Sequence, residues 1–199
     1  MKLVRYGAKG KELPGIIDND GKLRSLAGLV NEESEQFLSD KGLAELGRMN
    51  LSKLPLVPGK PRFGCPVANV SKFVAIGLNY TDHAKETNSP IPKEPIIFMK
   101  ALNCLQGPND NVMLPRGSVK TDWEVELGIV IGKKTRYVTK ENALDHVAGY
   151  VLVNDVSERE FQAERGPQWD KGKGCDTFGP VGPYLVTRDE VEDPQNLEL

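Results

Sequence analysis

Short apolar runs separated by polar turn residues dominate the chain from residue 71 onward. Runs of about four to eight apolar residues are typical of buried strands, whereas helices need longer periodic patterns. We therefore predict buried strands at 71–78 (SKFVAIGL), 95–99 (PIIFM), 124–131 (EVELGIVI) and 147–153 (VAGYVLV), and a short fifth strand at 184–187. Because the helical patterns between them are short, this part of the chain predicts a mainly β domain within an α+β protein.

The first 54 residues have a different pattern and predict a small separate module. Residues 2–6 alternate weakly, and residues 14–26 predict a hairpin that turns at Asn19-Asp20-Gly21. Residues 33–48 have apolar positions at helical spacing, interrupted by Gly42. These patterns predict a small N-terminal module made of a hairpin and a helical segment.

Four prolines between residues 55 and 66 predict an extended linker, because proline fixes φ and lacks an N–H donor. We place a domain boundary there, with a small N-terminal domain and linker at 1–65 and a larger second domain at 66–199. The final residues, 196–199, begin an alternating strand that stops at the last residue. An unpaired strand at a terminus exposes a sticky edge, so we expect the chain to be a fragment.

Composition excludes several classes of protein. The 199 residues carry 26 Lys+Arg and 28 Asp+Glu, a net charge of −2, and the pI of about 5.8 argues against a nucleic-acid partner. No apolar run is long enough to cross a bilayer, and the N-terminus has no secretory signal. The three cysteines form no CxxC pair and predict free thiols in a reducing cytoplasm.

An acidic stretch is the sharpest chemical feature. On a strand, Asp122, Glu124 and Glu126 share one face, because side chains alternate. A solvated face on an edge strand is one interpretation of this pattern. A site for Mg²⁺, Ca²⁺ or Mn²⁺ is the other, since adjacent carboxylates repel one another unless a cation lies between them.

A second acidic position follows the apolar run 147–153, which brings Asp155 to the end of a strand. Ser157 and Glu160 have the spacing of a capping box at a helix N-terminus, although Asp155 is an alternative cap. Arg159 and Gln162 are three residues apart and predict one helix face that grips a substrate carboxylate. A surface arginine with an acidic neighbour is the alternative.

Candidate acid–base groups lie after two other predicted strands. His83 and Glu86 are three residues apart, so on a helix the carboxylate would orient the imidazole as a general base. An exposed or structural histidine is the alternative. Lys100 ends the PIIFM strand, and glycines flank Lys173, which permits close approach to a ligand. No GxGxxG or GxSxG motif is present, so dinucleotide binding and α/β-hydrolase chemistry are excluded.

Five segments resemble, in order, those of the fumarylacetoacetate hydrolase family: GLNYTDHAKE, PIIFMKALNCLQGPNDNV, KTDWEVELGIVIGKK, HVAGYVLVNDVSEREFQ and QWDKGKGCDTFGPVGPYLVT. The likeness is strong over residues 70–199, loose over 1–65, and closest to the bacterial 2,4-diketo-3-deoxy-sugar-acid and acylpyruvate hydrolases. It implies a mixed β-sandwich or β-roll catalytic domain behind a small α+β domain, assembled as a homodimer. It also implies a continuation through a TGTP-like loop that this chain lacks.

The same resemblance implies a set of site residues. Glu124, Glu126 and Asp155 would hold Mg²⁺ or Mn²⁺. The other implied roles are water activation by His83 with Glu86, stabilisation of negative charge by Lys173, and a substrate pocket lined by Tyr80, Lys100, Arg159 and Gln162.

The implied reaction is hydrolysis of a C–C bond in a 2,4-dioxo acid. The alternatives on the same scaffold are an isomerase or decarboxylase of the 2-hydroxyhepta-2,4-diene-1,7-dioate type and a ureidoglycolate lyase. A ligand-binding protein without catalysis is the remaining alternative, and it would not need His83, Glu86 and Lys173 together.

Overall fold

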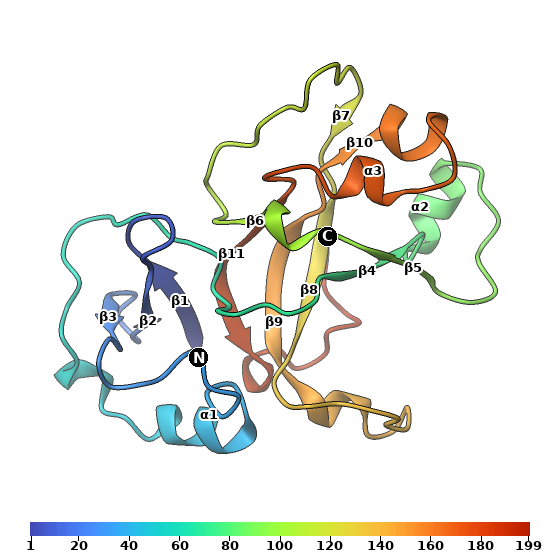
Figure 1. Ribbon diagram of the computed structural model, residues 1–199. Helices are drawn as coiled ribbons and strands as arrows, with labels where there is room; N and C mark the ends of the chain where they lie inside the picture. Colours follow the sequence, from blue (N-terminus) through green and yellow to red (C-terminus); the bar gives the residue numbers. More distant parts are fainter.

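The computed structural model describes all 199 residues and is built around one seven-stranded sheet (Figure 1). Six strands follow the order β3-β2-β1-β11-β9-β8 with antiparallel neighbours, and β6 pairs in parallel with β11. The bounds of these strands are β1 Lys2–Tyr6, β2 Leu13–Ile17, β3 Leu23–Ser25, β6 Leu105–Gln106, β8 Val125–Ile131, β9 Val147–Asn154 and β11 Gly179–Thr187.

Two small sheets and short helices surround this main sheet. β4 (Val74–Gly77) pairs with β5 (Ile96–Met99), and β7 (Thr121–Asp122) pairs with β10 (Ser157–Glu158). None of the helices is both long and apolar enough to cross a membrane. The helical segments are α1 Asp40–Gly47, α2 Thr81–Glu86, α3 Asp170–Lys173, the 3₁₀ turns η1 Leu51–Lys53, η2 Leu102–Cys104, η3 Ala143–His146 and η5 Arg188–Glu190, and the π-helical turn η4 Glu160–Glu164.

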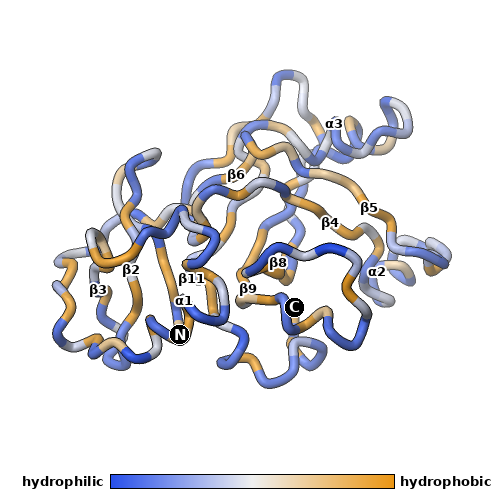
Figure 2. Tube along the Cα trace, turned by 60° about the horizontal axis from the view of Figure 1, so that its bottom comes forward, coloured by the Kyte–Doolittle hydropathy of each residue, from blue (hydrophilic) through white to orange (hydrophobic).

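The hydrophobic core joins the first 65 residues to the rest of the chain. β1 pairs directly with β11, and apolar segments converge on this junction in Figure 2. The largest buried cluster takes members from both parts: Leu3, Ile16, Leu26, Leu46, Val151, Val153, Val181 and Leu185. The mainly β, α+β prediction is confirmed, while the boundary at residue 65 and the missing C-terminal part stay predictions.

The predicted N-terminal hairpin is confirmed. β2 and β3 pair with Ile17 opposite Leu23. The Asp18 carboxylate accepts hydrogen bonds from the backbone N–H groups of Asp20 and Lys22, which closes the turn.

The predicted helix over residues 33–48 is wrong in its first half. α1 begins at Asp40, and the Ser39 hydroxyl accepts a hydrogen bond from the Gly42 N–H. The preceding residues turn back over this first helical turn, so a Cβ on Gly42 would lie only 2.2 Å from the Gln36 carbonyl oxygen. Gly42 therefore permits a close approach of two segments, which helical periodicity alone does not reveal.

The first two predicted strands exist but are not buried. Val74 is 48% exposed and Ile97 is 66% exposed, because the β4–β5 ribbon lies outside the main sheet and only one of its two faces is packed against other residues. Its other face packs on Trp169: the Phe98 ring meets the indole edge-on at 5.6 Å, and a Cβ on Gly77 would lie 2.5 Å from the same ring.

β8 is also half-exposed rather than buried. It forms the edge of the main sheet, and Val125, Ile129 and Ile131 are each more than half exposed on its outer face. The predicted strand at 184–187 is only the end of the longer β11, whereas the predicted burial of β9 is confirmed.

Candidate active site

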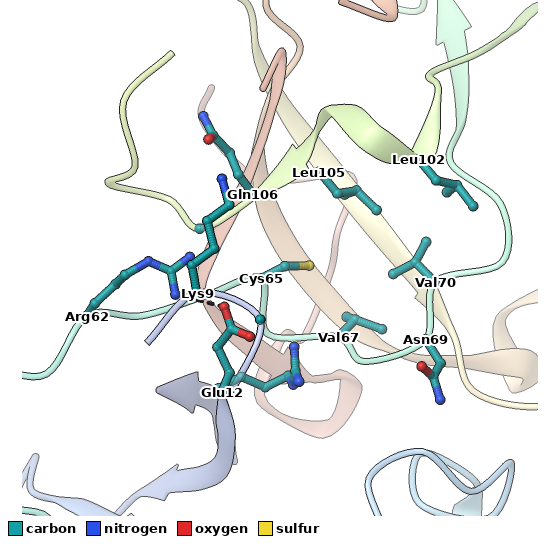
Figure 3. A pocket seen from close by; sticks show the side chains of 13 residues that line it. Lys9, Glu12, Arg62, Cys65, Val67, Asn69, Val70, Leu102, Leu105 and Gln106 are labelled. Carbon is teal, nitrogen blue, oxygen red and sulfur yellow. Dashed lines mark hydrogen bonds and ion pairs between the residues drawn. The ribbon is translucent and has the colours of Figure 1, made fainter. Parts of the chain in front are cut away.

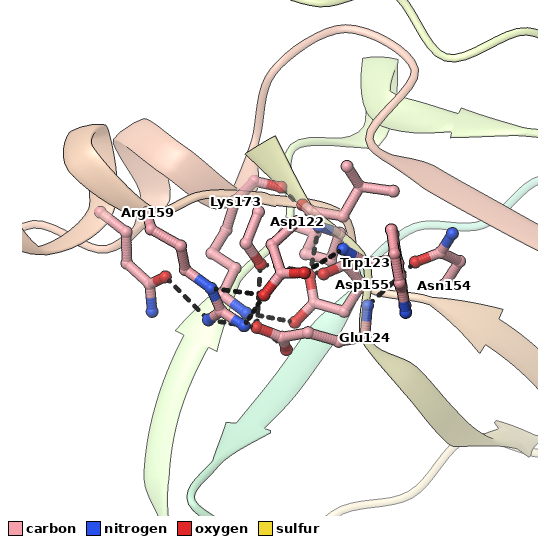
Figure 4. Close-up of polar contacts among 11 residues, drawn as sticks. Asp122, Trp123, Glu124, Asn154, Asp155, Arg159 and Lys173 are labelled. Carbon is pink, nitrogen blue, oxygen red and sulfur yellow. Dashed lines mark hydrogen bonds and ion pairs between the residues drawn. The ribbon is translucent and has the colours of Figure 1, made fainter. Parts of the chain in front are cut away.

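An acidic cluster forms where β8 begins and β9 ends. These strands are antiparallel, with Val125 opposite Asn154, so the residues beside this pair meet at one end of the sheet. One carboxylate oxygen from each of Glu124, Glu126 and Asp155 lies within 4.8 Å of the others. We call these three residues the acidic cluster; Glu124, Asp155 and their polar neighbours are drawn in Figure 4. The predicted set of candidate metal ligands is thus brought together in space.

The backbone around the acidic cluster is fixed by hydrogen bonds. The Asp155 N–H donates to the Glu124 carbonyl at 2.9 Å, and the Glu124 N–H donates to Asn154 Oδ1 at 3.2 Å. The Ser157 hydroxyl donates to Glu124 Oε1 at 3.0 Å and is fully buried. Asn154 and Ser157 are thus supporting residues that the sequence prediction missed, although both flank Asp155 in the chain.

The predicted capping box at Ser157 and Glu160 is wrong. Ser157 belongs to β10, opposite Asp122 in β7, and its hydroxyl faces Glu124 instead of a helix end. The buried Glu158 carboxylate caps the following turn by accepting from the Phe161 N–H at 2.7 Å. It also accepts from the Lys120 N–H, and these bonds lower the pKa of Glu158 although its burial opposes them.

Two cations contact Glu124, one at each carboxylate oxygen. Lys173 lies at the end of α3, is 2% exposed, and places Nζ 2.8 Å from both Glu124 Oε2 and Asp155 Oδ2. The Arg159 guanidinium lies 2.5 Å from Glu124 Oε1 and also bonds Asp122. Asp122 is therefore an anchor for Arg159 and lies outside the acidic cluster.

The predicted pairing of Arg159 with Gln162 on one face is confirmed. The Arg159 Nη1 group donates to Gln162 Oε1 at 3.4 Å, and Gln162 is buried. The guanidinium thus bonds Gln162 together with Asp122 and Glu124 at the edge of the acidic cluster.

Lys100 is enclosed next to the same carboxylates. It follows β5 and is 1% exposed. Its ammonium group donates to Asp155 Oδ1 at 2.5 Å, to the Lys173 carbonyl at 2.5 Å and to the Val156 carbonyl at 3.3 Å.

Glu126 is the member of the acidic cluster that lacks an ion-pair partner. Burial, followed by the negative charges of Asp155 and Glu124, raises its pKa to about 7. The pKa of Tyr80 is also raised, by burial and then by the neighbouring Glu126 carboxylate. Tyr80 directly precedes α2, so this contact brings the start of α2 to the acidic cluster.

His83 and Glu86 both lie on α2, as predicted. His83 is half-buried and Glu86 is exposed, and their side chains share no hydrogen bond in this structure. The helix is held at its C-terminal end, where the Thr87 hydroxyl donates to the His83 carbonyl at 2.8 Å.

A cavity of about 330 Å³ lies apart from the acidic cluster, among residues of β1, the following loop and the segment 62–107 (Figure 3). Its polar side carries Lys9, Glu12 and Arg62, and its apolar side includes Val67 and Leu105. None of the predicted site residues lines it.

Comparison with known proteins decides the family. Residues 72–199 match the family model described as "Fumarylacetoacetate (FAA) hydrolase C-terminal". The chain belongs to the fumarylacetoacetate hydrolase family. It is 60% identical to a Burkholderia lata protein named "Putative hydrolase", over all of this chain and 71% of that protein.

Solved structures of the family have the same fold. Fumarylacetoacetate hydrolase from Exiguobacterium antarcticum superposes with a TM-score of 0.75 at 31% identity, covering 95% of this chain and 67% of that one. A 2-hydroxyhepta-2,4-diene-1,7-dioate isomerase from Mycobacterium marinum gives 0.69 at 32% identity, covering 94% and 66%. The chain is thus an enzyme of a family that includes both hydrolases and isomerases and that commonly binds a divalent metal.

Proposed function

We propose that this protein is a divalent-metal-dependent hydrolase that cleaves a C–C bond in a 2,4-dioxo acid, either an acylpyruvate or a 2,4-diketo-3-deoxy sugar acid. The observation that carries the proposal is the acidic cluster, whose three carboxylates lie within 4.8 Å of one another beside Lys173. Family membership supports the same reaction class.

The donor set of the acidic cluster fits Mg²⁺ or Mn²⁺. Carboxylate oxygens are the ligands these ions prefer. Burial first, and then the charges of Asp155 and Glu124, raise the pKa of Glu126, so a bound cation would stabilise its ionised form. Glu124, Glu126 and Asp155 would hold the ion, which when bound supplies Lewis-acid polarisation of the substrate's 2-oxo group.

The remaining roles fall to side chains around the acidic cluster. His83 takes a proton from water, whose oxygen adds to the C4 carbonyl carbon, and Glu86 on the same helix would turn toward the imidazole to orient it. Lys173 donates to the oxygen that becomes negative in this addition. The C3–C4 bond then breaks and C3 takes up a proton, so one water is consumed and a carboxylic acid and a 2-oxo acid are released.

Three other side chains near the acidic cluster would bind and orient the substrate. Arg159 and Gln162 would bind the substrate carboxylate, which would replace bonds that the guanidinium now makes to Asp122 and Glu124. The Tyr80 hydroxyl, beside Glu126, would contact the substrate from the start of α2. Such fixed donors give orientation as well as affinity.

The direct test follows the ultraviolet absorbance of the enol of acetylpyruvate with purified protein, in Mg²⁺ or Mn²⁺ and again in EDTA. We expect metal-dependent loss of absorbance, with one pyruvate appearing per substrate consumed. Unchanged absorbance with every acylpyruvate and diketo sugar acid tested would contradict the proposal.

Isomerisation is the second candidate, because one similar structure is a 2-hydroxyhepta-2,4-diene-1,7-dioate isomerase. Mass spectrometry of the products separates the reactions. Hydrolysis gives two fragments, decarboxylation gives CO₂, isomerisation conserves mass, and a ureidoglycolate lyase forms urea. Stabilisation by oxalate and Mg²⁺ without turnover of any substrate would indicate a binding protein.

We also propose a cytoplasmic homodimer. Its three cysteines are free thiols, and the outer face of the β4–β5 ribbon exposes Val74, Ile76, Ile97 and Met99. Apolar patches of this kind are typical of subunit interfaces. Sedimentation equilibrium at micromolar concentration should give twice the mass of the chain, and a monomer would refute the dimer.

A further inference from the structure

Lys100 has no N–H group left for a substrate. A lysine ammonium has three donors, and three acceptors surround this one: Asp155 Oδ1, the Val156 carbonyl and the Lys173 carbonyl. The side chain is also completely shielded from solvent. The pocket-lining role that the family resemblance implies for Lys100 therefore conflicts with its geometry.

The bonds of Lys100 fix the orientation of the Asp155 carboxylate. Lys100 binds Oδ1, while Lys173 binds Oδ2. Because Lys100 holds Oδ1, Oδ2 is the oxygen that shares Lys173 Nζ with Glu124 Oε2, each at 2.8 Å. Lys100 also places a positive charge against a carboxylate that is only 3% exposed, so this buried charge has a partner.

The same ammonium holds the end of α3. The Lys173 carbonyl is at the last residue of this single helical turn, where carbonyls have no partner within the helix. Lys100 thus fixes the backbone from which the Lys173 side chain extends to the acidic cluster. Its own position is fixed by its N–H, which donates to the Phe73 carbonyl next to the β4–β5 ribbon.

We propose that Lys100 is a positioning residue that does not contact substrate. It orients the Asp155 carboxylate and the end of α3 so that Asp155 Oδ2 and Lys173 Nζ both face Glu124. This inference rests on the proposed function. It assigns to Lys100 an effect on cation affinity that a substrate-contacting lysine would not have.

The test compares Lys100→Met with Lys133→Met, which removes an ammonium paired only with Asp40 at the surface. Mn²⁺ alone is titrated by calorimetry, and kcat and KM for acetylpyruvate are measured at saturating Mn²⁺. Loss of a group that orients a metal ligand typically lowers metal affinity about 10- to 100-fold. We expect a loss of this size in Lys100→Met with a lower kcat and an unchanged KM, and wild-type values in Lys133→Met.

The opposite pattern, wild-type Mn²⁺ affinity with a raised KM, would overturn the proposal and restore a substrate contact. If wild-type protein binds Mn²⁺ but cleaves nothing, the proposed reaction fails, while the Mn²⁺ titration still decides the role of Lys100. A wild-type protein that binds no Mn²⁺ would overturn both.

Circular dichroism establishes that the variants fold, and Lys100→Gln replaces Lys100→Met if the latter does not. Should neither fold, reductive methylation of native wild-type protein decides. A positioning Lys100 stays unmodified with or without oxalate and Mn²⁺, whereas modification that oxalate prevents would show a substrate contact and overturn the proposal.

Discussion

Two groups of partly buried carboxylates and cations in this molecule have opposite electrostatic properties. The first is the Arg62 cluster, in which the guanidinium binds Asp110 through two bonds of 2.6 Å and Glu12 through one of 2.8 Å. The second is the acidic cluster with its neighbouring lysines. In the Arg62 cluster every carboxylate bonds a cation directly, whereas in the acidic cluster Glu126 does not.

The pKa shifts follow this difference. The bonds from Arg62 lower the pKa of Asp110, and they lower the pKa of Glu12 although its burial opposes them. The pKa of Glu126 is instead raised to about 7 by burial and by its acidic neighbours. In the Arg62 cluster one guanidinium is shared by two carboxylates and stabilises both, whereas in the acidic cluster Glu126 is the carboxylate that an added cation would pair.

Replacing Glu126 should give the largest difference between the two clusters in Mn²⁺ affinity and turnover. Glu126→Ala removes one of three ligands, so we expect Mn²⁺ affinity to fall more than about 100-fold and turnover roughly 10⁴-fold. Asp110→Asn in the Arg62 cluster is the matched control and should retain Mn²⁺ affinity. Calorimetry and acetylpyruvate assays measure both, and normal Mn²⁺ binding by Glu126→Ala would show that the ligand assignment is wrong.

A substitution on α2 should lower turnover without changing Mn²⁺ affinity. His83→Ala removes the general base, which is typically worth about 10²–10⁴-fold, so turnover should fall about 10³-fold. Mn²⁺ affinity should stay at the wild-type value, because His83 is not in the acidic cluster. The second histidine supplies the control, His146→Ala, and equal activity of the two variants would remove His83 from the mechanism.

The Arg62 cluster should respond through stability alone. Arg62→Ala leaves Asp110 and Glu12 partly buried without a cation. We expect a loss of about 2–3 kcal/mol in the free energy of unfolding, between the values for exposed and for buried pairs. Urea denaturation measures this loss, and a simultaneous fall in Mn²⁺ affinity would mean that the two clusters are not independent.

The smallest effect is a pH dependence of Mn²⁺ binding. A cation needs the ionised carboxylate of Glu126, whose pKa is raised to about 7. Affinity should therefore rise up to about tenfold per pH unit below 7 and level off above it. The stability of the metal-free protein should change in the opposite direction. Between about pH 4.5 and 7 Glu126 holds a proton in the folded state but not in the unfolded state, so the free energy of unfolding falls as the pH rises through this range. Glu126→Gln should remove both dependences.

Much of the acidic cluster could be predicted from sequence, because its members lie at the ends of strongly patterned strands. Glu124, Glu126 and Asp155 follow from strand alternation and from family resemblance. The bonds from Lys100 and Lys173 could not be predicted, since they join residues 55 and 18 positions away from Asp155. Ser157 was misassigned because a serine before an acidic residue has the same local pattern in a helix cap and in a short strand.

Burial was the least predictable property of the fold. β4, β5 and β8 have apolar sequences, but whether both faces are covered depends on the strands that lie beside them. The Arg62 cluster had no sequence signal either, because Glu12, Arg62 and Asp110 come from three distant segments. The hairpin predicted at 14–26 could be found from the sequence because the hydrogen bonds that close its turn are local.

The packing of Trp169 against Gly77 and Phe98 gives the protein a built-in fluorescent reporter. Trp169 directly precedes α3 and its indole packs on the β4–β5 ribbon, so its emission should report whether α3 and the ribbon stay in contact. The only other tryptophan, Trp123, is 79% exposed next to Glu124 and should emit as a solvated indole. The two emission components therefore distinguish an intact ribbon from a detached one without any added label.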